Sequence, residues 1–436
     1  MYSILRFLKS GMKSLKRERF FAGINILGLA LGMFCFIITS LYVRDELTHD
    51  KWHSNADDIY LAKIQYKTGG DGGMFLLPPF PYGKALMEAS PGVINQTNIS
   101  LGKKVSYTLK EETYESPHFY YSEPAIFEIF DFDLKLGNEE TVLSEPNNIV
   151  ISDALARKHF RGQNPLGEFI EVAEQGTFKI TGVLEPIRGN SHLYFDFIAP
   201  INLQAGNYKG MESNWQFGNG LIYLQVEPGY DLEKLSAEAS QMMEQHKTLD
   251  FPKEYAFGQF SSLYLNQDTW RNTSGGLFAG QTKYIYIFSL IGGLLLLVAC
   301  FNYINLTTAR AIARSKEMAI RKIVGASRSR LVMHSIGETV FLAVLALCIA
   351  FIAAELSLPA INNTLGKRLS LDFIGQPALW LLPISLVSLV IIISGIYPAI
   401  VSSTFNLSVL LKGANPGSRK SVIRKSLVVF QEYQGD

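Results

Sequence analysis

Four long apolar runs punctuate the chain, and each reaches the roughly 20 residues that a helix needs to cross the hydrocarbon core of a bilayer. The first run holds a single amide, Asn25. The fourth carries Pro383 and Pro398, which membrane helices tolerate where neighbouring helices satisfy the freed carbonyl groups. A soluble protein would need four helices that are apolar on every face to explain the same pattern. We therefore predict four transmembrane helices, at residues 20–43, 284–306, 336–358 and 379–401.

The long segment between the first two spans has a different pattern. Short runs rich in β-branched residues alternate with stretches of helical spacing. Asp231 is placed to cap the helix that follows it. The segment is therefore predicted to be a large mixed α/β domain inserted between spans 1 and 2, with strands at residues 148–152, 178–184 and 221–226 and helices at 152–160 and 232–246.

Lysine and arginine residues set the orientation of the spans, because cytoplasmic loops carry an excess of them. Residues 44–283 hold 20 basic and 32 acidic side chains, a formal charge of −12, and the loop at residues 359–378 has only Lys367 and Arg368. The three other segments are basic, so both termini are predicted in the cytoplasm and the large domain outside. The basic residues of these three segments are Arg6, Lys9, Lys13, Lys16, Arg17 and Arg19 before the first span; Arg310, Arg314, Lys316, Arg321, Lys322, Arg328 and Arg330 between the second and third; and Lys412, Arg419, Lys420, Arg424 and Lys425 after the fourth.

The first 19 residues have the pattern of an amphipathic helix, with bases between the apolar positions. Such a helix lies on the cytoplasmic leaflet, where lipid headgroups attract its bases. An unstructured basic flank that only fixes the orientation is the alternative. The apolar positions are Ile4, Leu5, Leu8, Met12 and Leu15.

Residues that would carry out chemistry are sparse. The three cysteines, Cys35, Cys300 and Cys348, lie inside apolar runs and are interpreted as small packing residues. His49 and His53 are four residues apart, but no Glu or Cys with zinc spacing accompanies them. No phosphate-binding GxxxxGK[ST] sequence occurs. We therefore expect a non-catalytic chain without a metal or cofactor of its own and without a nucleic-acid partner.

The segment between the second and third spans carries the sharpest pattern. Ile312, Ile320 and Ile323 fall at helical spacings and leave a strongly basic opposite face. Gly325 suits the end of this helix, and Ser327 suits the cap of the next one. A helix clamped between two spans can transmit force when a cytoplasmic partner grips it. A basic linker bound to lipid is the alternative that the residues leave open.

Several stretches resemble a known family. Residues 314–328 look like the motif that follows the second span in FtsX-like permease domains. The large domain is similar to the MacB-type periplasmic core domain at residues 148–160, 164–167, 178–184 and 190–197. The end of the fourth span and its exit agree as well, at residues 394–399 and 407–413. The resemblance covers nearly the whole chain, in the right order.

The resemblance implies a permease subunit of a MacB/FtsX-type ABC transporter in the bacterial inner membrane. A separate cytoplasmic ATPase would bind ATP and Mg²⁺, and two four-span units would pair, as a homodimer or a heterodimer. The motion of the periplasmic domains would then expel cargo through a periplasmic adaptor, extract lipoproteins, or activate a cell-wall hydrolase. The residues expected to couple the chain to the ATPase are Arg314, Lys316, Glu317, Arg321, Lys322, Gly325, Ala326 and Arg328.

One departure from many relatives concerns the end of the chain. Residues 424–431 look like the approach to a fifth span, but residues 432–436 turn polar. We expect either a single-unit permease that dimerises or an inactive, truncated half of a tandem permease. A scaffold that regulates a periplasmic hydrolase is a further alternative.

The expected order of segments combines these predictions. It comprises a cytoplasmic amphipathic helix (1–19), transmembrane helix 1 (20–43), a periplasmic domain (44–283, with an inserted subdomain at about 110–215), transmembrane helix 2 (284–306), a cytoplasmic coupling helix (307–333), transmembrane helix 3 (336–358), a short periplasmic loop (359–378), transmembrane helix 4 (379–401) and a cytoplasmic tail (402–436).

Overall fold

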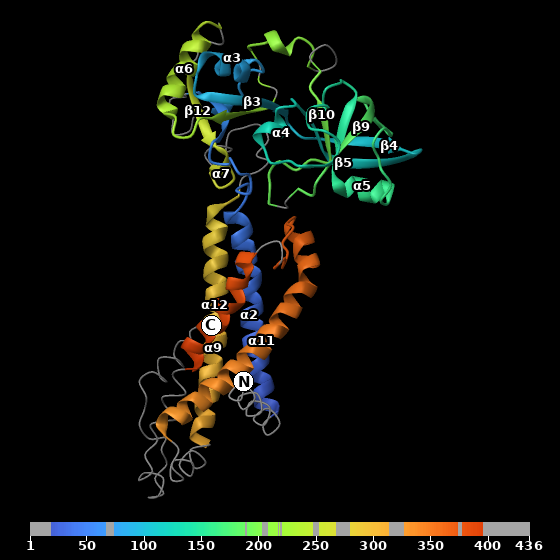
Figure 1. The fold of residues 1–436 in the computed structure, drawn as a ribbon. Coiled ribbons are helices and arrows are strands. Elements are labelled where there is room, and N and C mark those ends of the chain that lie inside the picture. Colours follow the sequence, from blue (N-terminus) through green and yellow to red (C-terminus); the bar gives the residue numbers. More distant parts are fainter. Residues whose placement is uncertain are drawn as a thin grey trace, which may run out of the picture. The chain divides into compact units, whose positions relative to one another are not determined.

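Three helices in the described part of the chain are long and apolar enough to cross a membrane (Figure 1). They are α2 (Arg19–Leu47), α9 (Thr282–Ala313) and α11 (Arg328–Leu365). A shorter apolar helix, α12 (Leu381–Val390), continues as a π-helical turn over Ile391–Gly395. The predicted fourth span extends beyond this turn. The computed structural model describes residues 19–66, 74–187, 190–202, 208–216, 218, 220–246, 253–266, 280–313, 327–373 and 377–395.

The third long helix extends further than its apolar run. The sequence pattern predicts an end at residue 358, but α11 continues through Pro359 to Leu365. The helix ends at Gly366, whose φ of +63° is the left-handed conformation that commonly follows a helix. Asn362 then accepts a hydrogen bond from the backbone N–H of Leu369 and donates one to its carbonyl, both at 2.9 Å.

Glycines bring α2 and α9 close together. A Cβ atom added at Gly32 would lie 2.5 Å from Cβ of Ala299, and one at Gly28 would lie 3.3 Å from Nδ2 of Asn302. Gly28 and Gly32 therefore form the small-xxx-small pattern that allows helix backbones to approach in a membrane. Further along the pair, Thr39 of α2 occupies the space beside Gly292 of α9.

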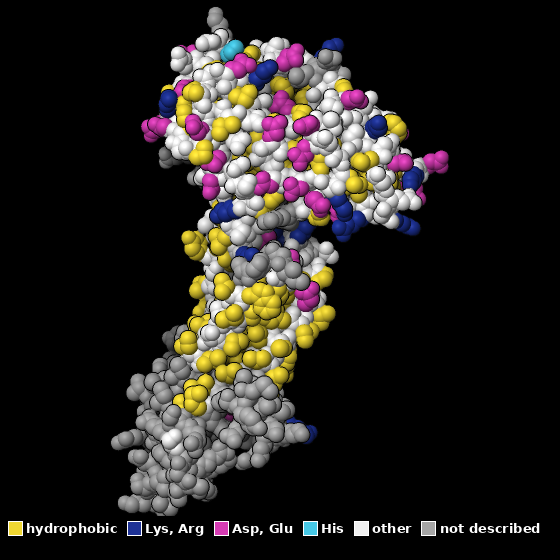
Figure 2. Space-filling view, viewed as in Figure 1, with side chains coloured by type: hydrophobic (Ala, Val, Ile, Leu, Met, Phe, Trp, Pro, Cys, Tyr) yellow, Lys and Arg dark blue, Asp and Glu magenta, His cyan; other side chains and the backbone are white. Residues whose placement is uncertain are grey.

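The third helix packs against the first two through small side chains and one polar contact. Four buried alanines on α11 belong to the same apolar core as Leu29 and Met33 of α2. The Tyr303 hydroxyl of α9 donates a buried 3.0 Å hydrogen bond to Thr339 Oγ1 of α11. Large apolar side chains cover the outward surfaces of the helices (Figure 2). The buried alanines are Ala343, Ala346, Ala350 and Ala354.

The unit Asp45–Thr282 contains a 12-stranded sheet in its described part. Four strands of it run antiparallel in the order β3-β11-β1-β12, and α3 and α6 cover one face of these four strands (Figure 1). We call these four strands the helix-covered sheet. The chain order is that of a split βαβ fold, with an insert between β3 and β11. The elements are β1 (Ile59–Tyr66), α3 (Tyr82–Ala89), β3 (Val93–Ser100), β11 (Gly220–Val226), α6 (Leu232–Glu244) and β12 (Lys253–Gln259), with β2 (Met74–Leu76) paired to β1.

The insert closes six strands on themselves. The pairs β4–β5, β5–β10, β10–β7, β7–β9, β9–β8 and β8–β4 return to the first strand, so these six strands share one interior. Closure removes the unpaired edges of a small sheet. The strands are β4 (Lys103–Leu109), β5 (Glu112–Ser122), β7 (Asn148–Ile151), β8 (Phe169–Val172), β9 (Gly176–Leu184) and β10 (Phe197–Pro200).

The core of this closed sheet extends from Val105 to Ala199. A boundary at residue 110 would fall in the turn of the β4–β5 hairpin, whereas the shared core includes both of its strands. α5 (Asp153–Phe160) follows β7, and Ser152 Oγ caps it by accepting a 3.2 Å hydrogen bond from the N–H of Leu155. β6 (Leu134–Leu136) pairs with β9.

The helix-covered part and the closed part of the sheet are joined where Ile99 of β3 pairs with Ser122 of β5, and a further core lies between them. It covers the face of the helix-covered sheet that α3 and α6 leave open, and it includes Tyr223 of β11 and Phe195 beside β10. The short helices α4 (Ile126–Ile129) and α7 (Phe260–Leu263) contribute to it. The described strands and helices give the domain the mixed α/β character that its sequence predicts. Two 3₁₀ turns, Met211–Ser213 and Pro377–Trp380, complete the described elements.

Candidate functional site

The predicted coupling residues lie almost wholly outside the described residues. Arg314, Lys316, Glu317, Arg321, Lys322, Gly325 and Ala326 fall in the gap between α9 and α11, and Arg328 is the first residue of α11. Residues 1–18 of the amphipathic helix predicted at 1–19 and the tail at 402–436 also lie outside. These predictions therefore stay predictions.

The residues directly after α2 form a buried polar network instead. We call residues 45–58 the entry segment, because they lead from α2 into the domain. Oδ1 of Asp50 accepts a 2.9 Å hydrogen bond from the backbone N–H of His192, and Oδ2 lies 2.6 Å from its Nδ1. The Nε2 atom of His192 is 2.8 Å from the Tyr223 hydroxyl. All three side chains are buried, so the network joins the entry segment to the central strand β11.

The charges of this network fix its hydrogen atoms. Burial alone would raise the pKa of Asp50, but the charge and hydrogen bonds of His192 outweigh it, and the pKa is lowered. A carboxylate next to Nδ1 requires the proton on that nitrogen. Burial, with a smaller contribution from the Asp50 charge, raises the pKa of Tyr223 well above its ordinary value. The tyrosine therefore keeps its hydroxyl proton.

The backbone of the entry segment is also bound to the insert. The N–H of Asp50, whose φ is 60°, donates a 2.9 Å hydrogen bond to the carbonyl of Asn190. Asn190 Nδ2 donates in turn to the carbonyl and hydroxyl oxygens of Thr48, at 3.1 and 3.0 Å. Ser54 donates through both its N–H and its hydroxyl to the carboxylate of Asp131. The entry segment is thus held both to the chain between α4 and β6 and to the chain that follows β9.

A second set of contacts connects the end of α2 to the segment that leads back to α9. The Tyr264 hydroxyl donates a 3.0 Å hydrogen bond to Oε1 of Glu46. The His49 ring stacks on the Tyr264 ring, with centroids 3.5 Å apart and planes 16° apart. Gly280 donates its N–H to the carbonyl of Tyr264 at 2.8 Å. The segment that enters the domain after α2 and the segment that leaves it before α9 are therefore bound to each other.

The two histidines that the sequence places four residues apart have separate surroundings. His49 stacks on Tyr264, whereas His53 lies among aromatic rings and its Nδ1 accepts a 3.0 Å hydrogen bond from the N–H of Asp131. Within the described residues, no group of three or more His, Cys, Asp or Glu side chains could hold a metal ion. Cys300 is buried, Cys35 is half-buried, and Cys348 is exposed on α11 rather than packed inside.

Sequence reasoning missed the Asp50–His192–Tyr223 network. His192 is 142 residues from Asp50 and 31 residues from Tyr223, so no local spacing points to it. The stretch 190–197 was informative only as part of a family resemblance. A signal existed in the residue types, because a His that directly precedes the apolar run 193–195 needs polar partners when it is buried.

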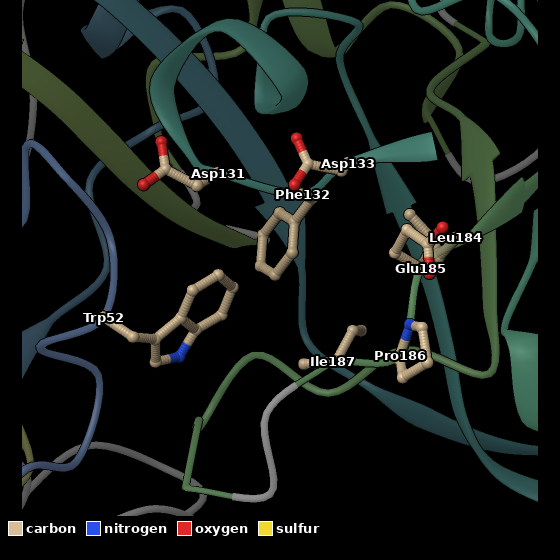
Figure 3. A pocket seen from close by; sticks show the side chains of 8 residues that line it. All are labelled: Trp52, Asp131, Phe132, Asp133, Leu184, Glu185, Pro186 and Ile187. Carbon is tan, nitrogen blue, oxygen red and sulfur yellow. The ribbon is translucent and has the colours of Figure 1, made fainter. Parts of the chain in front are cut away.

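Trp52 of the entry segment lines an open pocket of about 590 Å³ (Figure 3). The ring of Phe132 and the indole of Trp52 face it from one side, and Pro186 and Ile187 face it from the other. The Trp52 and Phe132 rings pack edge to face, with centroids 5.8 Å apart. We call this the Trp52 pocket. The described residues that line it are Trp52, Asp131, Phe132, Asp133, Leu184, Glu185, Pro186 and Ile187.

Comparisons with known proteins cover both parts of the chain. Residues 22–242 match the model of the MacB-like periplasmic core domain, and residues 289–407 match the FtsX-like permease C-terminal model. The uncharacterized ABC transporter permease YknZ of Bacillus subtilis is 28% identical over 197 residues, which are 44% of this chain and 44% of the relative's own length.

Two solved structures are also similar. A domain of a putative permease from Porphyromonas gingivalis has a TM-score of 0.42 and 25% identity, covering 48% of this chain and 92% of that one. The periplasmic region of MacB from Actinobacillus actinomycetemcomitans has a TM-score of 0.33 and 14% identity, covering 45% of this chain and 88% of that one.

Proposed function

This chain belongs to the MacB/FtsX-like family of ABC transporter permeases, and we propose that it transmits the ATP-driven motion of a cytoplasmic ATPase to its periplasmic domain. Permease subunits of this family are generally non-catalytic, and membership implies an ATPase partner. It also implies an inner-membrane protein with a periplasmic domain. The finer steps below are part of the proposal.

The observation that carries the proposal is the Asp50–His192–Tyr223 network. Asp50 follows the last residue of α2, Leu47, by three positions, and Tyr223 lies in the middle of β11. Removing one partner of this buried network leaves polar groups unsatisfied, which costs roughly 1–3 kcal/mol for each group and more for a charged one. A displacement of α2 therefore moves the sheet with it more readily than it breaks this contact.

At the cytoplasmic side, residues 314–326 receive the force. They connect α9, which ends at Ala313, to α11, which begins at Arg328. The buried Tyr303–Thr339 hydrogen bond ties those two helices together. A partner that displaces the segment therefore tilts both helices as a pair. Among the predicted coupling residues from Arg314 to Arg328, we assign the main contacts with the ATPase to Arg321 and Lys322.

The membrane arrangement completes the proposal. The chain has four spans and cytoplasmic termini, with α12 forming the start of the fourth span. Two such units pair in the membrane. The apolar character of α12 and the permease match that continues to residue 407 support the fourth span.

Charge reversal tests the coupling role. The change Arg321→Glu with Lys322→Glu replaces two bases on the gripped surface, and like-charge contacts then oppose the partner. We expect the ATPase that co-purifies with the chain to lose about tenfold or more in affinity, which corresponds to roughly 1.4 kcal/mol. Arg419→Glu with Lys420→Glu makes the same charge change in the tail and should leave binding intact. Unchanged ATPase binding in the first variant would contradict the proposal.

A further inference from the structure

We propose that the Trp52 pocket binds a basic peptide segment that carries an apolar side chain. The inference deepens the proposed function, because it names a class of ligand for the periplasmic domain and connects its binding to the moving part of the chain.

The volume and the walls suit a small organic group. Small-molecule pockets commonly measure about 300–1,000 Å³, and this one measures about 590 Å³. Trp52 and Phe132 present aromatic surface on one side, and Pro186 and Ile187 present aliphatic surface on the other (Figure 3). An apolar side chain inserted between these walls loses contact with water on both faces.

The charge around the pocket favours a cation. Three of its eight described lining residues, Asp131, Asp133 and Glu185, are acidic, and none of the eight is basic. The carboxylate of Asp131 already accepts hydrogen bonds from Ser54, so it contributes its charge rather than a vacant acceptor. Asp133 and Glu185 are exposed and able to meet a ligand. The His53 ring stacks on one face of the Trp52 indole, with centroids 3.7 Å apart, so the other face is the one that can attract an ammonium or guanidinium group.

Position connects the pocket to the entry segment. Trp52 lies between Asp50, which binds His192, and Ser54, which binds Asp131. A ligand that packs against Trp52 therefore stabilises one arrangement of the entry segment over others. Linkage is reciprocal, so an arrangement of the entry segment that reshapes the pocket also changes the affinity for the ligand.

A short blocked peptide, Lys-Trp-Lys, tests the proposal with the full-length chain in nanodiscs of neutral phosphatidylcholine. Isothermal titration calorimetry should detect saturable binding of this peptide and no binding of blocked Glu-Trp-Glu or Lys-Gly-Lys. Equal binding of Lys-Trp-Lys and Glu-Trp-Glu, or no binding of Lys-Trp-Lys, would overturn the proposal. No ATPase is present, so this outcome is independent of whether the coupling role holds.

A charge reversal on the rim locates the binding. Glu185→Lys should lower the affinity for Lys-Trp-Lys by about tenfold or more, because like charges then face each other. Glu171→Lys makes the same change at an exposed position of β8 and should have no comparable effect. Thermal melting confirms that both variants fold. Equal effects of the two variants would show a diffuse attraction to the acidic domain and would reject the pocket.

Hydrogen exchange provides a second location test in the unmodified chain. Bound Lys-Trp-Lys should slow amide exchange in residues 51–55 and 184–187, which form opposite walls of the pocket. Protection confined to other parts of the domain would overturn the assignment even if the peptide binds.

Discussion

Asp50 and His192 are 142 residues apart in the chain, yet Nδ1 of His192 lies 2.6 Å from a carboxylate oxygen of Asp50. Both side chains are buried, and the far nitrogen of the ring binds Tyr223. This contact makes the residues just after α2 part of the domain's interior. In the proposed function, this contact carries a displacement of α2 into the domain.

The first prediction concerns the stability of this attachment. Asp50→Asn removes the charge that both donors of His192 require, so the folded domain should lose about 3 kcal/mol of unfolding free energy. In thermal melting of the full chain in detergent, that loss corresponds to a decrease of roughly 6–12 °C. Asp133→Asn makes the same chemical change at an exposed position and should leave the midpoint within about 1 °C. Equal midpoints for the two variants would show that Asp50 contributes little.

The second prediction is a dependence on acid. The pKa of Asp50 is lowered from its ordinary value of 3.8, so the unfolded chain binds this proton more tightly than the folded one. The stability that Asp50 contributes is therefore present above pH 3.8 and lost as the pH falls through the lower folded-state value. Denaturant midpoints measured from pH 5 to pH 2.5 should fall more steeply for the unmodified chain than for Asp50→Asn. Parallel curves would contradict this assignment.

The third prediction concerns Lys63 of β1. Burial lowers its pKa from 10.5 to about 8, so its charged form destabilises the fold at neutral pH. Lys63→Met should raise the unfolding free energy at pH 7 by on the order of 2 kcal/mol. Because the unfolded lysine retains its proton up to a higher pH, the advantage of the variant should shrink as the pH rises from 8 to 10.5. A constant difference across that range would rule out this cause.

The fourth prediction compares two glycines of α2. A Cβ atom at Gly32 would lie 2.5 Å from Cβ of Ala299, whereas nothing lies within 4 Å of a Cβ atom at Gly23. Gly23→Ala should therefore stabilise the helix slightly, by up to about 1 kcal/mol. Gly32→Ala should separate α2 from α9 and lower the thermal midpoint in detergent. If both variants shift the midpoint in the same direction, the close approach of α2 and α9 at Gly32 does not determine the stability of the helix pair.

Local pattern alone predicts much of the domain. The strands predicted at residues 178–184 and 221–226 are confirmed as β9 and β11, and the helix after Asp231 is confirmed as α6. The Asp231 carboxylate accepts a 2.9 Å hydrogen bond from the N–H of Glu233, as a capping residue should. These features depend on neighbours within a few positions, which the sequence displays directly.

Long-range features could not be predicted in this way. The parallel pair β5–β10 closes the six-stranded sheet, but residues 119 and 197 that pair in it are separated by six other described elements. The extension of α11 to Leu365 depends on Gly366 ending the helix rather than on the apolar run. The Asp50–His192 contact depends on the tertiary fold. The coupling helix and the four-span count remain predictions.

The central claim is that ATP used in the cytoplasm moves the periplasmic domain. Two spin labels report that motion as a distance distribution, one at Glu171→Cys in the domain and one at Ser370→Cys after α11. The three native cysteines are replaced by serine in this chain. With the co-purified ATPase, trapping with ATP and vanadate should shift this distribution, and Arg321→Glu with Lys322→Glu should abolish the shift. An unchanged distribution while the bound ATPase hydrolyses ATP would contradict the account.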